Sequence, residues 1–98
     1  MVVNHNVRSW SHFFQAIVSG AKKHDLRDLH DRDYKVDDIV NLQEYDNING
    51  CYTGREQWVK ITYITSRDRP CAFSSAVLDN NYAILSLALV GSVRGGDK

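Results

Sequence analysis

The sequence is poor in residues that cross-link a chain or interrupt its regular structure. It contains two cysteines and one proline among 98 residues, and its formal net charge at pH 7 is zero. Cys51 and Cys71 lie far apart and have no Cys-x-x-Cys neighbour or histidine partner pattern, so we expect reduced thiols, not a disulfide framework or a zinc site. A neutral chain also lacks an overall attraction to nucleic acid, so any such role requires a local site.

Long apolar runs are missing as well. The longest, Ala83 to Val90, has about eight residues, whereas a membrane-spanning helix needs roughly 20. The first residues show no basic start followed by an apolar run and a cleavage site, so we expect no secretory signal and, by default, a cytoplasmic location. The length favours a single domain over residues 1–90, followed by a flexible glycine-rich tail at 91–98.

One helix stands out from its periodicity. Ser9 or Ser11 would cap its start, and Gly20 would end it because glycine accepts a left-handed conformation. The helix should run from about Ser11 to Ser19, since apolar residues recur there at helical spacing: Trp10, Phe13, Phe14, Ile17 and Val18.

Strands are predicted by alternation or by short apolar runs, over residues 2–7, 22–27, 38–45, 56–65 and 82–90. Ranges 38–45 and 56–65 should form an antiparallel pair, joined by a reversal at the DNING sequence, residues 46–50. The range 82–90 is apolar on both faces and should be the most buried strand. Residues 72–79 are apolar but short, so helix and strand both stay open.

Charged residues gather between Lys22 and Asp38, with five Lys or Arg and six Asp. This mixture is not a plain phosphate-binding patch. Strand alternation would place Asp25 and Arg27 on one face. In the functional interpretation Arg27 binds a phosphate or a base edge and is oriented by the carboxylate. In the alternative interpretation the two residues form an ordinary structural ion pair.

Arg32 lies between Asp31 and Asp33 and is therefore already neutralised locally. Its guanidinium could bind a ligand bidentately or donate to backbone carbonyls that fix the loop, and its five donors favour the second role. We expect these three residues to act as a structural clamp on the loop that enters the strand at Asp38.

Aromatic residues and histidines offer further candidates. Bases of RNA could stack on four aromatic side chains, although aromatics in so small a domain more often belong to the core: Tyr34, Tyr45, Tyr52 and Trp58. The four histidines lack the His-x-x-x-His spacing of a metal site: His5, His12, His24 and His30. No glycine-rich phosphate loop or Ser-His-Asp signature is present, so no metal or cofactor is expected.

Several strings, in this order and spacing, resemble the small ASCH-related domains of bacterial and phage genomes. They cover roughly Asn4 to Leu89 and include His5 to Arg8, Lys22, Asp25 to Arg27, DRDYKVDDI at 31–39, YTGRE at 52–56, ITYI at 61–64 and YAILSL at 82–87. The resemblance implies a PUA-like α+β fold, a small β-barrel of about five or six strands with one or two helices.

The resemblance also implies a cleft associated with RNA or nucleoside binding. A related branch deacetylates acetylcytidine with a Lys, a Thr three residues later and a distant Glu. Lys22 falls at the Lys position, but Asp25 stands in place of the Thr nucleophile. Asp37 stands where relatives have a turn glycine, and Asp tolerates positive φ at modest cost.

Three functional hypotheses follow. The first is an RNA- or modified-nucleotide-binding module, with these binding residues: Lys22, Lys23, Arg27, Tyr52, Arg55 and Lys60. The second is a small amidohydrolase acting on acylated nucleosides such as acetylcytidine, with Lys22 and Asp25 as catalytic residues. The third is a protein-interaction module, for instance a phage factor that binds a host protein.

Overall fold

The computed structural model describes residues 3–29, 32–67, 79 and 81–95. In these residues the chain forms β1 (Asn4–Trp10), α1 (Ser11–Val18), β2 (His24–Asp28), β3 (Ile39–Asp46), β4 (Cys51–Ser66) and β5 (Tyr82–Gly95). The strands make one sheet in the order β1-β3-β4-β5-β2. β1 is parallel to β3, and the other neighbours are antiparallel.

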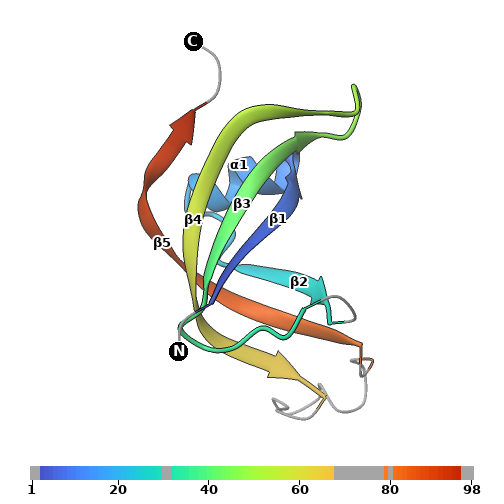
Figure 1. Ribbon diagram of the computed structural model, residues 1–98, viewed down its shortest axis with the longest axis vertical. Coiled ribbons are helices and arrows are strands. Elements are labelled where there is room, and N and C mark those ends of the chain that lie inside the picture. The colour runs from blue at the N-terminus through green and yellow to red at the C-terminus, as the bar shows by residue number, and fades with distance from the viewer. Residues whose placement is uncertain (1–2, 30–31, 68–78, 80, 96–98) are drawn as a thin grey trace.

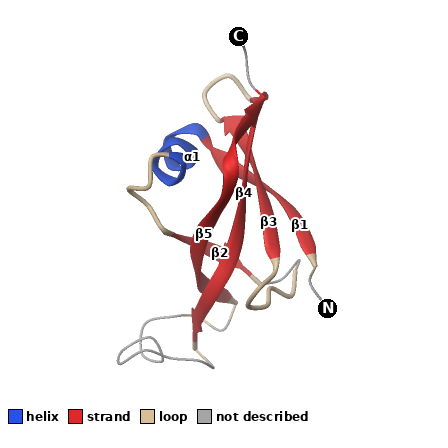
Figure 2. Cartoon of the chain, turned by 90° about the vertical axis from the view of Figure 1, so that its left-hand side faces the viewer, coloured by secondary structure: helices blue, strands red, loops and turns tan. Residues whose placement is uncertain are grey.

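The sheet is strongly curled and forms a half-barrel, with α1 against one side (Figures 1 and 2). This confirms the predicted α+β, small-barrel class. The antiparallel pairing predicted for residues 38–45 and 56–65 is confirmed by β3 and β4. No helix in the described ranges is long and apolar enough to cross a membrane.

The core lies between α1 and the sheet face that α1 covers. Phe14 and Ile17 of α1 are 0% and 2% exposed and belong to one hydrophobic cluster with residues of four strands, among them Val7, Leu42, Ile61 and Leu85. An isolated helix of eight residues is unstable in water. Burial of two large side chains, worth roughly 1.5–3 kcal/mol each, therefore holds α1 in place.

Asp38 fixes the start of β3. Its side chain is almost fully buried, and its oxygens accept hydrogen bonds from the backbone N–H groups of Val3 and Lys35, both at 3.1 Å. His5 Nε2 lies 2.8 Å from Asp38 Oδ2. Burial acts to raise the pKa of the Asp38 carboxyl, but the hydrogen bonds from His5, Val3 and Lys35 outweigh it and leave the pKa below its ordinary value. The carboxylate thus ties the start of the chain to the loop before β3.

Two turns follow their predicted chemistry. Residues 46–50 reverse the chain between β3 and β4, with Gly50 N–H bonded to the Asp46 carbonyl at 2.7 Å. Asp37 adopts φ 79° at the position where the domains that the sequence resembles have a turn glycine. Asp is therefore tolerated there, as predicted.

The start of α1 differs from the prediction. Trp10 is the N-cap residue, and no side chain caps the helix. Ser9 cannot do so because it points to the buried side of β1, and Ser11 Oγ lies 3.4 Å from the Tyr45 carbonyl instead. The serine cap was wrong, whereas the predicted left-handed Gly20 after the helix is confirmed by its φ of 87°.

β5 also differs from the prediction. It was expected to be the most buried strand and to end at Val90, but its residues from Ala88 to Ser92 are exposed and it continues to Gly95. The reason is topological, because β2 pairs with β5 only from Tyr82 to Ser86, and beyond Ser86 β5 is an edge of the sheet. Residues 91–95 were expected in a flexible tail, but they belong to β5, whose end pairs with β4. The open segment 72–79 lies outside the described residues except for Asp79.

Candidate nucleic-acid interface

Lys22, Asp25 and Arg27 meet at β2, and we call them the Asp25 cluster. Lys22 Nζ lies 3.2 Å from Asp25 Oδ1, and Arg27 Nε lies 2.6 Å from Asp25 Oδ2. All three side chains are mostly buried. One carboxylate thus holds two cations, so the cluster keeps one net positive charge.

The alternation of β2 positions this cluster. Asp25 and Arg27 lie on the half-buried side of the strand, which confirms that they are neighbours. Lys22 precedes the strand and reaches back to it, donating to the His24 carbonyl at 2.5 Å. β5 holds the strand in register, with Asp25 opposite Leu85.

Arg27 also joins the two edges of the sheet. β1 and β2 are the edge strands in the strand order. Arg27 Nη2 donates to the Arg8 carbonyl of β1 at 2.8 Å. The curl of the half-barrel therefore brings its two edges within reach of a single side chain.

Two open cavities adjoin the Asp25 cluster and share Phe13, Asp25 and Leu26. The first cavity has a volume of about 210 Å³ and is also lined by Arg8, Ser9, Trp10 and Arg27. The second has a volume of about 240 Å³ and is also lined by Lys22 and His24. We call the two together the Asp25 hollow.

The hollow has an exposed aromatic wall. Trp10 and Phe13 are 49% and 44% exposed, and their rings stack with centroids 6.3 Å apart. Lys22 Nζ lies 5.8 Å from the Phe13 centroid. Exposed ring faces beside two cations can hold a planar base and an anion together.

Sequence reasoning missed this wall. The helical pattern assigns Trp10 and Phe13 to the same buried face as Phe14 and Ile17. In the structure Trp10 precedes α1 as its N-cap, and Phe13 is turned one residue, about 100°, away from Phe14. The short predicted length of the helix could have indicated this, because a helix of so few residues buries only one narrow stripe and leaves its other apolar side chains exposed.

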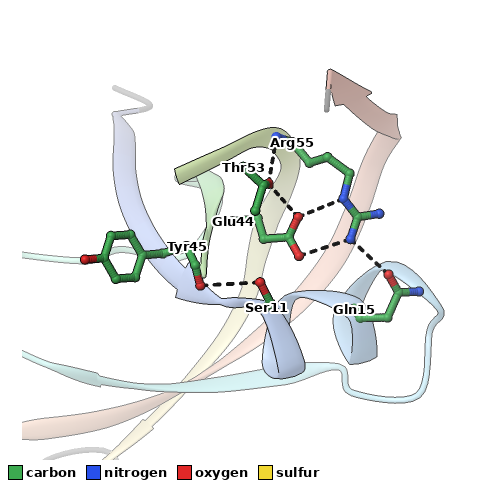
Figure 3. Close-up of polar contacts among 6 residues, drawn as sticks. All are labelled: Ser11, Gln15, Glu44, Tyr45, Thr53 and Arg55. Carbon is green, nitrogen blue, oxygen red and sulfur yellow. Dashed lines mark hydrogen bonds and ion pairs between the residues drawn. The ribbon is translucent and has the colours of Figure 1, made fainter. Parts of the chain in front are cut away.

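A second cluster surrounds Glu44, which is 5% exposed (Figure 3). Arg55 donates to its carboxylate from Nε at 2.8 Å and from Nη2 at 3.1 Å, and Thr53 Oγ1 donates at 2.6 Å. Arg55 Nη2 also reaches Gln15 Oε1 of α1 at 3.1 Å. The hydrogen bonds from Arg55 lower the pKa of the Glu44 carboxyl against the opposing effect of burial, so it stays ionised.

The Glu44 cluster occupies the point where the pairing of β3 and β4 is irregular, between Gln43 and Tyr45. A cavity of about 360 Å³ opens there and is lined by Gln43, Glu44, Tyr52, Gly54, Arg55 and Glu56. Arg55 donates to Glu44 and to Gln15, so these contacts connect the irregular part of the β3–β4 pairing to α1.

Comparison with known families shows that one family model covers the residues of both clusters. The family model described as a domain of unknown function, DUF3850, matches residues 4–87. The chain belongs to the DUF3850 family. None of the curated proteins compared with the sequence matches it. The Asp25 hollow and the Glu44 cluster both lie inside the matched range of the DUF3850 domain.

The DUF3850 domain separates the predicted nucleic-acid-binding residues. Lys22 and Arg27 lie together in the Asp25 hollow, whereas Tyr52 and Arg55 line the cavity beside Glu44. Lys23 borders a third, mainly apolar cavity of about 330 Å³ between α1 and β5. Lys60 Nζ lies 3.3 Å from Asp37 Oδ1. The structure thus does not gather all six side chains at one place, and their binding roles stay predictions.

The predicted clamp residues are exposed where they are described. Arg32 and Asp33 both lie at the surface, and Asp33 Oδ2 lies 2.9 Å from Lys35 Nζ. Asp31 lies outside the described residues. The clamp stays a prediction, while Asp38 makes the buried contacts of this loop. In the described part of the DUF3850 domain, no three His, Cys, Asp or Glu side chains converge as metal ligands would.

Proposed function

We propose that this DUF3850 domain is an RNA- or modified-nucleotide-binding module of the ASCH/PUA-like type, and that the Asp25 hollow is its site. A base stacks on the Trp10 and Phe13 rings, and Lys22 and Arg27 bind the phosphate or a base edge. Asp25 holds the two cations in position.

The observation that carries the proposal is the combination of exposed aromatic faces with a fixed guanidinium in one hollow. Trp10 is 49% exposed although it is the kind of side chain that small domains bury. Arg27 commits Nε to Asp25 and Nη2 to the Arg8 carbonyl, while Nη1 has no acceptor among the residues that the structure describes. An immobilised guanidinium with an open edge loses little entropy when it binds a phosphate or a base.

The hydrolase hypothesis receives less support from this geometry. Both Asp25 oxygens already accept hydrogen bonds, one from Lys22 and one from Arg27. A carboxylate held in this way is badly placed to take a proton from an attacking water. Incubation of acetylcytidine with the protein tests this alternative, and release of cytidine above the level of a Lys22→Ala variant would favour hydrolysis.

Binding of labelled single-stranded and structured RNA, measured by fluorescence anisotropy over a range of salt concentrations, tests the proposal. We expect affinity to fall with salt, since phosphate contacts release counterions. Arg27→Ala and Trp10→Ala should each weaken binding by about 1–3 kcal/mol, the range for one base or phosphate contact.

Lys35→Ala is the matched control. Lys35 is an exposed cation paired with a carboxylate, Asp33, outside the hollow. Its loss should leave binding nearly unchanged. Melting temperatures of all variants separate lost contacts from lost folding. Absence of RNA binding even at low salt would overturn the proposal, and RNA-independent capture of a host protein from nuclease-treated bacterial lysate would favour a protein-interaction module instead.

A further inference from the structure

Arg8 lies at the end of the Asp25 hollow and differs from the other cations there. It lines the cavity of about 210 Å³ together with Trp10 and Arg27. Lys22 and Arg27 share Asp25, whereas Arg8 has no carboxylate partner among the described residues. Its guanidinium carbon instead lies 4.1 Å from the Tyr45 ring centroid and 5.7 Å from that of Tyr52.

The strand register explains this arrangement. Alternation puts Arg8 and Trp10 on the same, exposed side of β1. Trp10 is in register with Tyr45 of β3, and Tyr45 with Tyr52 of β4, so the two tyrosines lie beside Arg8. Their rings meet edge to face at 5.1 Å. A hydrogen bond with the Tyr52 side chain raises the pKa of the Arg8 guanidinium, against the smaller effect of desolvation.

Arg8 is thus oriented by aromatic neighbours but keeps its positive charge available to an external anion. It also adjoins the proposed site directly, because its own carbonyl accepts the hydrogen bond from Arg27 Nη2. The three cations are thus linked in series, because Lys22 and Arg27 share Asp25 and Arg27 bonds to the backbone of Arg8. One phosphate cannot use all of them, whereas consecutive phosphates of a strand can.

We propose, on the basis of the proposed function, that the ligand is a single strand of at least two nucleotides rather than a mononucleotide. One base stacks at Trp10 beside Arg27, and the phosphate that follows binds Arg8 next to Tyr45 and Tyr52. Arg8 is then a binding residue that selects ligands by the number of their phosphates.

The test compares adenosine 5′-monophosphate with the dinucleotide pApA, titrated into the wild-type chain and an Arg8→Ala variant. We expect the wild type to bind pApA about tenfold or more tightly than the mononucleotide, and Arg8→Ala to lose most of that gain while binding the mononucleotide as before. The slope of log affinity against log salt for pApA should become shallower by about 0.7, the value for one phosphate on a single strand.

Arg94→Ala is the matched control. Arg94 is also an exposed arginine above an aromatic ring, 5.7 Å from the Trp58 centroid, but it belongs to β5 and lines neither cavity of the hollow. It should change neither ligand's affinity. Arg8→Lys should recover part of the gain because it keeps the charge. Should Arg8→Ala fail to fold, Tyr52→Ala removes an exposed part of the same subsite and should lose the gain as well.

Two results would overturn the inference and are distinguishable. Equal affinity of the wild type for the two ligands, or a gain that survives in Arg8→Ala, refutes the extended site while leaving the proposed function intact. If neither of the two ligands nor a longer RNA binds, the proposed function fails and the extended site fails with it.

Discussion

Replacing Asp38 by alanine should destabilise the domain more than replacing any exposed carboxylate. The side chain is 1% exposed and serves three donors from two separate parts of the chain, the segment of Val3 and His5 and the loop at Lys35. Asp38→Ala deletes both acceptor oxygens, and with them all three hydrogen bonds, without changing the backbone conformation that β3 requires.

The magnitude follows from how buried each donor is. His5 is 6% exposed, and a buried donor left without an acceptor costs about 1–3 kcal/mol. The bonds to the Val3 and Lys35 amides are only partly buried, so water replaces the acceptor and each loss is about 0.5–1.5 kcal/mol. We expect a total loss of about 3 kcal/mol, which lowers the melting temperature of a domain of this size by roughly 12–24 °C.

The lowered pKa of Asp38 adds a pH dependence of defined sign. The folded carboxyl holds its proton less tightly than the unfolded one, so its stabilisation is complete above the ordinary Asp pKa, about 3.9, and is lost as the pH falls through the folded value. The stability difference between wild type and Asp38→Ala should therefore shrink as the pH is lowered from about 5 to about 3.

Urea unfolding followed by circular dichroism measures both effects. Asp33→Ala serves as control, because the Asp33–Lys35 pair is largely exposed and should contribute at most about 0.5 kcal/mol. A loss below about 1 kcal/mol for Asp38→Ala, or a difference from wild type that does not change in acid, would refute this account of the loop.

Substitutions at three further sites have defined expectations, measured by urea unfolding except where another assay is named. Asp37→Gly should be neutral or stabilising by up to about 1 kcal/mol and Asp37→Val destabilising by about 1–2 kcal/mol, since φ is 79° there; equal stability of the two variants would contradict this. Arg55→Ala should cost about 2–3 kcal/mol, less than for a fully buried pair because Arg55 is 31% exposed, and adding Glu44→Gln should recover part of it. Failure of Glu44→Gln to recover anything would show that the two residues are not coupled. Arg32→Ala should lower stability by ~1 to 3 kcal/mol if the predicted clamp exists, and an unchanged melting temperature together with lost ligand binding would assign Arg32 to the site.

Local sequence patterns predicted the structure correctly wherever the contacts that determine it join residues close in the sequence. The extent of α1, the turn at residues 46–50 and the pairing of β3 with β4 all follow from neighbours within a few tens of residues. The contact between Asp25 and Arg27 was predictable for the same reason, because strand alternation alone puts them on one side.

Contacts between distant segments were not predictable in this way. Neither the parallel pairing of β1 with β3 nor the attachment of β2 to β5 leaves a signal in local periodicity. The bridge from Arg27 to the Arg8 carbonyl depends on both.

Glu44 shows where a sequence signal existed and was incomplete. It continues the inward alternation of Val40 and Leu42, which indicates a buried carboxylate. Its partner Arg55 lies across an irregularity in the pairing of β3 with β4, so counting along the strands does not identify it.

The attachment of β2 to β5 has a consequence for the order in which the chain is made. β2 carries the Asp25 cluster, but the strand with which it pairs begins at Tyr82, near the end of the described chain. A ribosome adds ~5–20 residues per second, so β2 leaves it several seconds before any partner strand exists. The first half of a nascent chain therefore cannot assemble the hollow, and a transcript truncated before β5 would yield a product that carries Lys22, Asp25 and Arg27 without the strand that joins β2 to the sheet.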